Sequence, residues 1–325
     1  MRKLNISVIG KTGHAARIIN ILNDIADVHI QNVYYYKKIT DNSLPITSNI
    51  KDLMSSDGII IASPTPTHAE YIDMLEGYKG YLLVEKPIVS TKKQTEMLCK
   101  IPLERKSRIK VNYNFLYSSI AISLKGLLTS SKIGSPISFD VHTSQGLAYK
   151  ENYKDSWRSN ISESFGVMEL VGVHFINLTL SLFGKIDYSR KDFLWKAGCK
   201  VGPPDTVFLR LKMYSGLCVN LFHSYAGPFF MRMMLMGTDG YWEYDGNKTH
   251  LHYPRDTFDT NNRFTTPPLA KRETFEFSHI WKESLFKSVN AFLDGIRFSG
   301  TFDPAEFEIA LASMEPIFES RNQCL

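Results

Sequence analysis

Two charged residues directly precede a proline in Glu85-Lys86-Pro87, at the end of the apolar run from Tyr81 to Val84. A short apolar run of this kind is typical of a buried strand. A lysine at the end of such a strand can transfer protons when its surroundings tune it towards neutral pH. A Glu-Lys pair can also be a surface ion pair of little consequence. The following proline and the strand end favour the first interpretation.

A dinucleotide phosphate loop is suggested by the segment Gly10 to Ala16, which follows the apolar run Leu4 to Ile9 and opens a helical pattern. Glycines in such a loop let the backbone turn tightly and approach a pyrophosphate at the helix N-terminus. Only Gly10 matches the Gly-x-Gly-x-x-Gly pattern, so an ordinary strand-turn-helix connection is about as consistent with this segment alone. The predicted cofactor contacts here are Gly10, Thr12, Gly13, His14 and Ala15.

The second strand would end in Tyr34-Tyr35-Tyr36-Lys37-Lys38, where NAD-binding domains normally carry an acidic residue for the adenosine ribose. No carboxylate stands there. Lys37 and Lys38 could pair with the 2′-phosphate of NADP instead, although lysines at a strand end are often only solvated. The cofactor is therefore predicted as NAD or NADP, with a weak preference for NADP.

A glycine and a histidine stand two residues apart in Gly172-Val173-His174, within a helical pattern from Phe165 to Phe183. Hydride transfer from a carbinol carbon needs a base for the hydroxyl proton, and a lysine or histidine suits that role. The bound cofactor would do the redox step while the protein positions it.

The elements that must position these residues differ between the two parts of the chain. The first 115 residues alternate short apolar runs with helical patterns, which indicates a parallel sheet. The predicted strands are 4–9, 28–35, 58–62, 81–84 and 109–112, and the predicted helices are 15–23, 67–76 and 91–99. From about residue 118 a helix to Leu128 is followed by alternating segments, which indicate a largely antiparallel sheet. The predicted elements there are strands at 137–144, 206–213 and 217–225, and helices at 165–183, 281–298 and 304–319. In the helix 281–298, Phe286, Val289, Phe292, Leu293 and Ile296 recur at helical spacing and are predicted to be buried.

Composition narrows the function classes. The 325 residues carry a formal net charge of +5, and the charged residues are scattered without a basic run, so nucleic acid is not an expected partner. An anionic small molecule is compatible with this charge. No apolar stretch is long enough for a signal segment or a membrane span, which predicts a cytoplasmic protein. Cys99, Cys199, Cys218 and Cys324 form no Cys-x-x-Cys pair, so reduced thiols and no metal site are expected.

Several motifs together resemble the glucose-fructose oxidoreductase and inositol dehydrogenase family (Gfo/Idh/MocA) over essentially the whole chain. Eight segments occur in the order and spacing that are typical of the family. They are the Gly10 loop, Ala62 to His68, Glu85-Lys86-Pro87, Ile133-Gly134, Trp157-Arg158, Gly166, Gly172-Val173-His174 and Leu182-Phe183-Gly184. The Glu-Lys-Pro motif combined with the Gly-x-His helix is the specific part.

The resemblance implies an α/β protein: a doubly wound Rossmann domain over residues 1–117 that binds NAD(P), then a substrate-binding α+β domain over 118–325 with an open, mostly antiparallel sheet. The outer face of that sheet often makes oligomer contacts, so a homo-oligomer is expected. The reaction implied is oxidation or reduction of a secondary alcohol or ketone, commonly of a sugar or nucleotide sugar.

By position, Lys86 resembles the lysine between the nicotinamide ribose and the substrate, and His174 resembles the histidine that hydrogen-bonds the reacting hydroxyl. The resemblance therefore implies that Lys86 and His174 are the catalytic residues. The further cofactor contacts implied are Ser63, Pro64, Thr65, His68, Glu85, Lys86 and Asn112. Together with Lys37 and the residues of the Gly10 loop, they complete the predicted set of cofactor contacts. The substrate contacts implied are Lys86, Trp157, Arg158 and His174. The segments around Arg158 and His174 are most similar to a branch acting on nucleotide-linked sugars in surface-polysaccharide pathways.

Leu170 departs from the family pattern, because an aspartate usually stands four residues before the histidine. Glu169 is adjacent, but on an α-helix it is rotated by about 140° from His174 and is not expected to replace the aspartate. Lys86 then becomes the stronger acid/base candidate. Two alternatives stay open: a catalytically impaired relative that binds nucleotide or sugar, and a redox-assisted lyase or hydrolase that regenerates its NAD(H) in each cycle.

Overall fold

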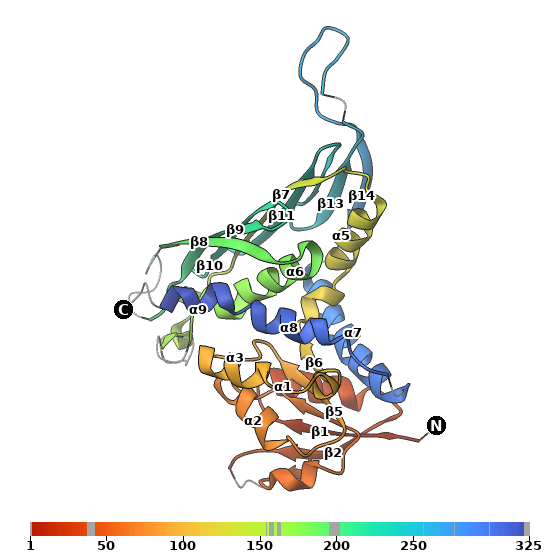
Figure 1. The fold of residues 1–325 in the computed structure, drawn as a ribbon, viewed down its shortest axis with the longest axis vertical. Coiled ribbons are helices and arrows are strands. Elements are labelled where there is room, and N and C mark those ends of the chain that lie inside the picture. Colours follow the sequence, from red (N-terminus) through yellow and green to blue (C-terminus); the bar gives the residue numbers. More distant parts are fainter. Residues whose placement is uncertain are drawn as a thin grey trace. The chain divides into compact units, whose positions relative to one another are not determined.

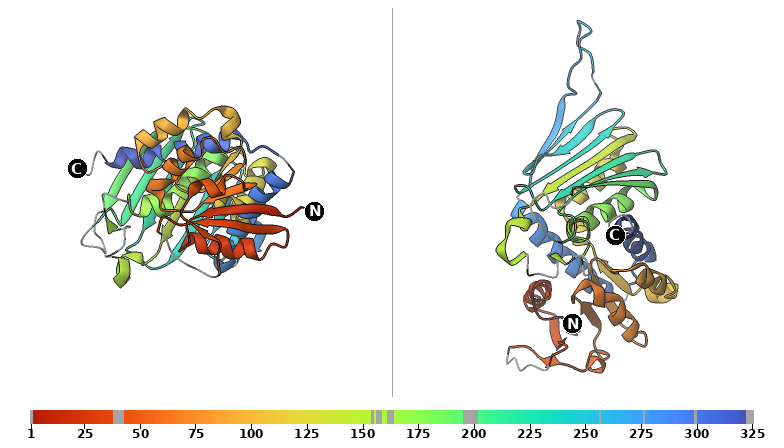
Figure 2. Two further views of the ribbon diagram at one scale, coloured as in Figure 1. Left: turned by 90° about the horizontal axis from the view of Figure 1, so that it is seen from below. Right: turned by 90° about the vertical axis from the view of Figure 1, so that its left-hand side faces the viewer.

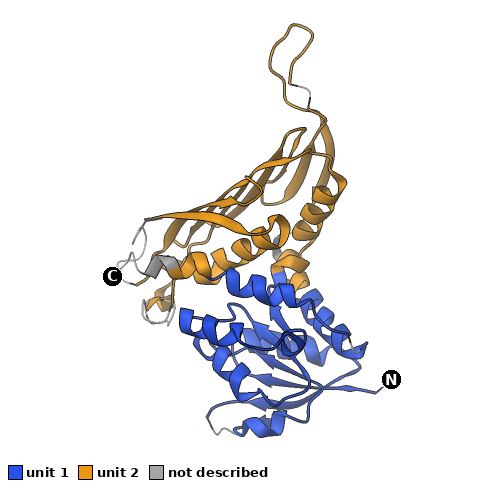
Figure 3. Cartoon of the chain, in the orientation of Figure 1, with its two compact units in different colours: residues 1–114, 285–314 blue, residues 115–284, 315–325 orange. Residues whose placement is uncertain are grey.

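The computed structural model divides into two compact units, residues 1–114 with 285–314 and residues 115–284 with 315–325 (Figure 3). It describes residues 2–37, 43–153, 155, 159–160, 164–194, 202–255, 257–275, 277–298 and 300–321. Lys38, Trp157, Arg158, Cys199 and Cys324 lie outside these residues.

A six-stranded parallel sheet forms the centre of the first unit, in the order β3-β2-β1-β4-β5-β6 (Figure 1). The strands are β1 (Leu4–Ile9), β2 (Val28–Tyr34), β3 (Ile46–Thr47), β4 (Gly58–Ile61), β5 (Tyr81–Glu85) and β6 (Ile109–Asn112). The helices are α1 (His14–Asn23), η1 (Ile50–Leu53), η2 (Thr65–Thr67), α2 (His68–Met74), α3 (Lys92–Cys99), α4 (Leu103–Lys106) and α8 (Pro304–Ala312). This is the doubly wound order of a Rossmann domain, which confirms the predicted fold class.

Helix α7 (Phe277–Arg297) supplies part of the core of this parallel sheet. Val289, Phe292 and Leu293 are fully buried against residues of β1, α1 and β4. A Cβ on Gly58, at the start of β4, would lie only 2.6 Å from Ile296 Cδ1 and 3.0 Å from Phe292 Cζ, so a larger residue there would force these helix side chains to shift. By its contacts, segment 285–314 thus belongs to the first unit, whereas the sequence placed it in the second domain.

Phe286 is the exception on α7. It is 46% exposed, so its predicted burial is wrong. Phe286 is three positions before Val289, but the buried stripe of the helix, which includes Val289, Phe292 and Leu293, is centred on another side of the helix.

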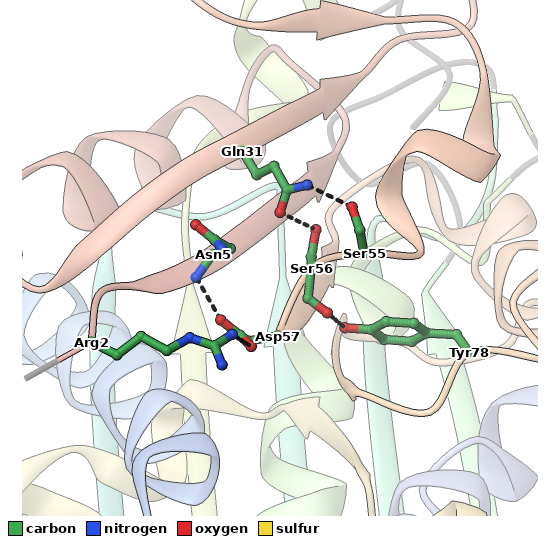
Figure 4. A network of polar contacts seen from close by, with 7 residues as sticks. All are labelled: Arg2, Asn5, Gln31, Ser55, Ser56, Asp57 and Tyr78. Atoms are coloured by element: carbon green, nitrogen blue, oxygen red, sulfur yellow. Dashed lines mark hydrogen bonds and ion pairs between the residues drawn. The ribbon is translucent and has the colours of Figure 1, made fainter.

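Polar contacts fasten the segment that enters β4 (Figure 4). Asp57 accepts hydrogen bonds from the Asn5 N–H at 2.8 Å and from Arg2 at 2.6 Å. Ser56 donates to Gln31, and its carbonyl accepts from the Tyr78 hydroxyl. The adjacent parallel strands are therefore tied together at the end remote from Gly10.

An eight-stranded sheet forms the second unit, in the order β14-β13-β12-β11-β7-β10-β9-β8. Its strands are β7 (Pro136–Ser144), β8 (Ile186–Leu194), β9 (Thr206–Met213), β10 (Cys218–Ser224), β11 (Phe230–Gly237), β12 (Tyr241–Tyr244), β13 (Lys248–His252) and β14 (Leu269–Thr274). All neighbours are antiparallel except β7 and β10, so the mostly antiparallel sheet that was predicted is confirmed. Between β13 and β14 the chain extends well beyond the end of the sheet (Figure 2).

Helical segments complete the second unit. They are η3 (Asn114–Tyr117), α5 (Ser119–Ser130), η4 (Leu147–Tyr149), η5 (Glu151–Tyr153), η7 (Met168–Gly172), α6 (Val173–Phe183) and α9 (Glu315–Arg321). Phe183 of α6 packs on Phe139 of β7, with ring centroids 5.4 Å apart. Alternate residues of β7, β9 and β10 are buried, which is the pattern of a sheet covered on one face.

Candidate functional site

Gly10 directly follows β1, at the point where the strand order reverses between β1 and β4. Its φ is 113°, and a Cβ added there would lie 2.7 Å from the carbonyl oxygen of Ala62. Any other residue would be strained and would collide with the backbone that follows β4. The crevice outside such a switch point is the usual ligand site of an open α/β sheet.

The start of α1 is open to an anion. Its N-cap is Gly13, with φ 62°; no side chain caps the helix, and no acidic residue lies in its first turn. A Cβ on Gly13 would meet nothing within 4 Å, and Thr12 is exposed. Ala15 is fully buried beneath the loop. The free N–H groups and partial positive charge of the helix start suit a pyrophosphate, so the loop fits a dinucleotide.

A buried carboxylate, Glu85, connects that loop to the ends of β5 and β6. Glu85 Oε1 lies 3.0 Å from His14 Nε2 and accepts a hydrogen bond from Asn112 Nδ2 at 2.5 Å. Burial alone would raise the pKa of Glu85, but His14, Asn112 and the charge of Lys86 outweigh it and hold that pKa below its usual range. The structure thus joins His14, Glu85 and Asn112 of the predicted cofactor set.

Ser288 extends this network and escaped the sequence prediction. Its hydroxyl donates to Asn112 Oδ1 at 2.6 Å from a position 176 residues away in the chain. With Oδ1 engaged, the Asn112 amide is oriented with its NH₂ towards Glu85. The available signal was a small polar residue on the otherwise apolar face of the predicted helix.

His68 links the turn after β4 to the turn after β5. Its Nε2 lies 2.8 Å from the Ser63 carbonyl oxygen and its Nδ1 lies 2.7 Å from the Pro87 carbonyl oxygen. Burial lowers the pKa of His68, although both carbonyls oppose that shift. His68 therefore fixes the relative positions of the Ser63–Thr65 turn and the segment carrying Lys86.

Lys86 itself follows β5 and precedes a cis peptide bond to Pro87. Its side chain is half-buried, whereas Thr65 is buried and Pro64 exposed. The carboxyl ends of β1, β4, β5 and β6 thus carry the predicted cofactor contacts along one edge of the sheet. Lys37 lies after β2, is exposed, and places its ammonium 5.3 Å from the ring centre of Tyr36.

In the second unit, His174 lies at the start of α6 and is 6% exposed. Its ring meets Trp281 edge to face, with centroids 5.3 Å apart. The next residue, Phe175, stacks its ring on the ring of His223, with centroids 5.3 Å apart. His174 is therefore held in an aromatic setting. Trp157 and Arg158, the other predicted substrate contacts, lie outside the described residues.

The helix leading to His174 is not α-helical throughout. Residues Met168–Gly172 form a π-helical turn, and the Val173 N–H donates to the Met168 carbonyl five residues back. The expectation that Glu169 is rotated by about 140° from His174 assumed 3.6 residues per turn, and it is wrong for this segment.

His223 on β10 is a second buried group that the sequence did not single out. It has no exposed surface, and its Nδ1 lies 2.7 Å from the Thr143 hydroxyl oxygen. Burial lowers the pKa of His223 to about 3. It is thus a neutral imidazole beneath the π-helical turn, where its Cδ2 would lie 3.1 Å from a Cβ on Gly172.

Family models match both parts of the chain. Residues 8–113 match the oxidoreductase family with an NAD-binding Rossmann fold. Residues 122–243 match the GFO/IDH/MocA C-terminal domain.

Curated relatives are similar over part of their length. Glucose-6-phosphate 3-dehydrogenase of Bacillus subtilis is 28% identical over 188 residues, which are 55% of this chain and 53% of that protein. The scyllo-inositol 2-dehydrogenase (NADP(+)) IolW of the same species is 22% identical over 126 residues, 39% of this chain and 34% of that protein. The chain thus spans about half or less of the curated relatives it matches.

Solved structures share the fold over nearly the whole chain. Levoglucosan dehydrogenase in complex with NADH and levoglucosan has a TM-score of 0.78 at 16% identity, covering 99% of this chain and 98% of that one. An NAD-binding oxidoreductase from Klebsiella pneumoniae has a TM-score of 0.77 at 18% identity, covering 98% of each chain. With both family models matched in order along one chain, the protein belongs to the Gfo/Idh/MocA oxidoreductase family.

Proposed function

We propose that this protein is an NAD(P)-dependent oxidoreductase that interconverts a secondary alcohol and a ketone of a sugar. The close approach of Gly10 to Ala62, beside an uncapped start of α1, carries the proposal. That arrangement accommodates a pyrophosphate, and the side chains of Glu85, Lys86 and Asn112 lie along the same edge of the sheet.

In this proposal the Gly10–Ala15 loop holds the phosphates, and the Ser63–Thr65 turn and Asn112 border the nicotinamide. The bound nicotinamide supplies hydride chemistry. Lys86 and His174 are the proton donors and acceptors for the substrate oxygen, and Trp157 and Arg158 contact the substrate. Lys86 is half-buried, and its charge is one of the causes that lower the pKa of the Glu85 carboxylate.

NADP is the proposed preference. The four residues directly after β2, Tyr35 to Lys38, include Lys37 and no carboxylate, so the usual acceptor for the ribose of NAD is absent at the strand end. The relative IolW carries NADP(+) in its name, whereas levoglucosan dehydrogenase was solved with NADH. Lys37→Glu should weaken binding of NADPH and leave or improve that of NADH.

The proposed substrate is a sugar, and within that class a nucleotide-linked sugar of surface-polysaccharide synthesis. Relatives named for glucose 6-phosphate and scyllo-inositol support the polyol class. The narrower assignment is based on the sequence around Arg158 and His174. Comparison of free sugars, sugar phosphates and nucleotide sugars as substrates tests it.

The decisive experiment is a fluorescence titration of the purified protein with NADH and NADPH, followed by assays of sugars at 340 nm. Micromolar binding with net reduction of NAD(P)+ is expected. Binding without turnover of any sugar would favour the impaired relative. Conversion of substrate without a steady change at 340 nm would favour the redox-assisted lyase or hydrolase.

We further propose a cytoplasmic homo-oligomer formed through the outer face of the eight-stranded sheet. Among the helices that the structure describes, none has the length and apolar character needed to cross a membrane. The outward side chains of β7, β9, β10 and β11 include Phe208, Phe222 and Met234, which are partly exposed. Light scattering coupled to gel filtration measures the mass of the assembly.

A further inference from the structure

Ser288 is a serine on the buried stripe of α7, and it has no exposed surface. The nearby stripe residues Val289, Phe292 and Leu293 are apolar. A hydroxyl in such surroundings is costly unless it is hydrogen-bonded. The Ser288 hydroxyl meets this requirement by donating to Asn112 Oδ1 at 2.6 Å, at the carboxyl end of β6. The direction of the serine side chain is therefore determined by its bond to Asn112.

The side chain of Asn112 connects Ser288 to the carboxylate of Glu85. Asn112 is 1% exposed and Glu85 is 7% exposed, so neither can replace a lost partner freely with water. Asn112 Nδ2 donates to Glu85 Oε1 at 2.5 Å. The reversed amide would place the Asn112 oxygen against the carboxylate, which is unfavourable because both groups are acceptors. Ser288 thus stabilises the orientation in which the amide donates to Glu85.

Glu85 keeps a low pKa although it is buried. Burial raises this pKa, but His14, the hydrogen bond from Asn112 and the charge of Lys86 together hold it below the ordinary value. His68 is a further titratable group that interacts with this carboxylate. Among these contributions, the hydrogen bond from Asn112 is itself supported by a residue of another element, α7.

The Glu85 carboxylate faces the start of α1 through His14, the first residue of that helix. His14 Nε2 lies 3.0 Å from Glu85 Oε1, and the side chain of His14 is 38% exposed whereas that of Glu85 is 9% exposed. One side of the imidazole therefore meets a buried carboxylate, while the rest is open to solvent at the uncapped helix start. A carboxylate fixed in place limits the positions of this ring beside the N–H groups that suit a pyrophosphate.

We propose that Ser288 is a positioning residue of the cofactor site, which acts through the Asn112 amide to hold the Glu85 carboxylate charged and in place against His14. This inference rests on the proposed function, in which the loop before α1 binds the phosphates of NAD(P). The elements α7, β6, β5 and α1 contribute one residue each to this network. The affinity for cofactor thus depends on a helix far from the loop in sequence, and Ser288 itself does not contact the cofactor.

A double-variant cycle tests the connection through Glu85. Ser288→Ala should raise the Kd for NADPH at pH 7 by about two- to tenfold, the range expected for one hydrogen bond. Glu85→Gln should raise it at least as much, because the charge itself is lost. In S288A/E85Q the Kd should equal that of Glu85→Gln alone, since Ser288 acts through that charge. Losses that multiply in the double variant, or an unchanged Kd in Ser288→Ala, would overturn the proposal.

Ser7→Ala is the matched control for loss of a buried hydroxyl. Ser7 also has no exposed surface in the first unit, and its hydroxyl shares a 2.6 Å hydrogen bond with that of Ser56. Its loss should destabilise the fold to a similar extent in urea unfolding but leave the Kd for NADPH unchanged. An equal rise of Kd in Ser7→Ala and Ser288→Ala would show that stability of the first unit, rather than the network, sets the affinity.

A titration of the protein without cofactor separates this inference from the proposed function. In protein labelled with ¹⁵N-asparagine, the side-chain NH₂ signal of Asn112 is assigned by its loss in Asn112→Ala, and its shift follows the protonation of Glu85. The midpoint should lie below 4.5 in the wild type and be higher in Ser288→Ala. Equal midpoints would overturn the role of Ser288. A shifted midpoint in a protein that binds neither NADH nor NADPH would instead count against the proposed function alone.

Discussion

Gly10 is the residue on which the backbone path of the proposed phosphate loop depends most. Its positive φ and the 2.7 Å approach to Ala62 leave no room for a side chain. Gly10→Ala should therefore weaken NADPH binding at least tenfold, since the loop must move to relieve the contact. Gly13→Ala is the control: it also has positive φ, but open space surrounds it, so a smaller loss is expected. Equal affinities for the two variants in the fluorescence titration would contradict this account.

Among the predicted site residues, Lys86 is expected to contribute most to the rate of proton transfer. Lys86→Met should lower kcat by about 10²- to 10⁴-fold and remove one limb of the pH–rate profile, which is the contribution usual for a general acid or base. Lys93→Met, on the exposed side of α3, is the control and should leave both unchanged. A pH–rate profile unaltered in Lys86→Met would exclude Lys86 from the acid/base role.

The turn at Gly10 and the strand end at Glu85 could be located from residue identities, because both signals are local, and their roles in cofactor binding stay predictions. His14, Glu85 and Asn112 were each expected at the cofactor edge, and the structure joins them. Ser288 was not expected, because a hydrogen bond across 176 residues leaves no trace in local spacing. The predicted roles of Lys86 and His174 stay predictions.

At the scale of elements, the strands that were predicted lie close to observed ones, because hydrophobic periodicity is a local signal. β8 and β14 correspond to no predicted strand, and the predicted helix 304–319 is divided into α8 and α9. The strand at 206–213 coincides with β9, and that at 4–9 with β1. The π-helical turn was missed, because tertiary packing around Gly172, rather than local preference, supports the wider turn. The parallel pairing of β7 with β10 likewise depends on chain topology.

His223, buried between β10 and the π-helical turn, should make the second unit sensitive to acid. Its pKa of about 3 in the fold lies below the ordinary value of 6.5. The unfolded chain therefore binds this proton first as pH falls below 6.5, and stability is lost down to about pH 3. The loss is about 1.4 kcal/mol per pH unit.

His223→Asn removes this titration while keeping a polar group near Thr143. Urea unfolding at pH 6.5 and 4.5 should show that the wild type loses roughly 2–3 kcal/mol more than the variant over that interval. Parallel losses in the two proteins would mean that His223 does not stay neutral in the fold.

Helix α7 is tied to the first unit by a two-pronged ion pair. Arg297 Nε and Nη2 donate to Asp27 Oδ2 and Oδ1 at 2.9 and 2.8 Å. The hydrogen bonds from Arg297 hold the pKa of Asp27 below 3.8, so this stabilisation is present above that pH and is lost as pH falls below it. Asp27→Asn should lower the free energy of unfolding at pH 7 by about 1 kcal/mol.

Asp294→Asn is the matched control for that pair. Asp294 also contacts Arg297, but only through one 2.8 Å bond within the same helix, and its side chain is 53% exposed. A smaller loss is expected in thermal unfolding at pH 7. If both variants lose the same stability, the Asp27–Arg297 ion pair contributes no more to the fold than the Asp294–Arg297 pair within the helix.

At the scale of the whole molecule, the first unit is discontinuous in sequence. Residues 285–314 contact residues 1–114 rather than the intervening chain, and Lys106 and Lys110 form ion pairs with Glu308 and Glu306 on α8. A domain boundary near residue 117 was predicted, because the sequence pattern changes there from short apolar runs with helices between them to long alternating segments. The local sequence pattern does not reveal that residues 285–314 return to the first sheet.

A fragment of residues 1–117 should consequently fail to fold stably, since the apolar face of its sheet lacks Val289, Phe292 and Leu293. We expect it to bind a hydrophobic dye and to be digested rapidly by protease. Residues 1–114 joined to 285–314 by a Gly/Ser linker should resist both. Equal protease resistance of the two proteins would show that α7 is dispensable for the sheet.

The same discontinuity determines the order of events on the ribosome. Domains usually fold from the N-terminus as they are made. Here the strands synthesised first must wait, with one apolar face exposed, until the segment ending at Met314 has emerged. The parallel sheet is therefore completed only after residues 115–284 have been synthesised, and an apolar face of its strands stays uncovered during that interval.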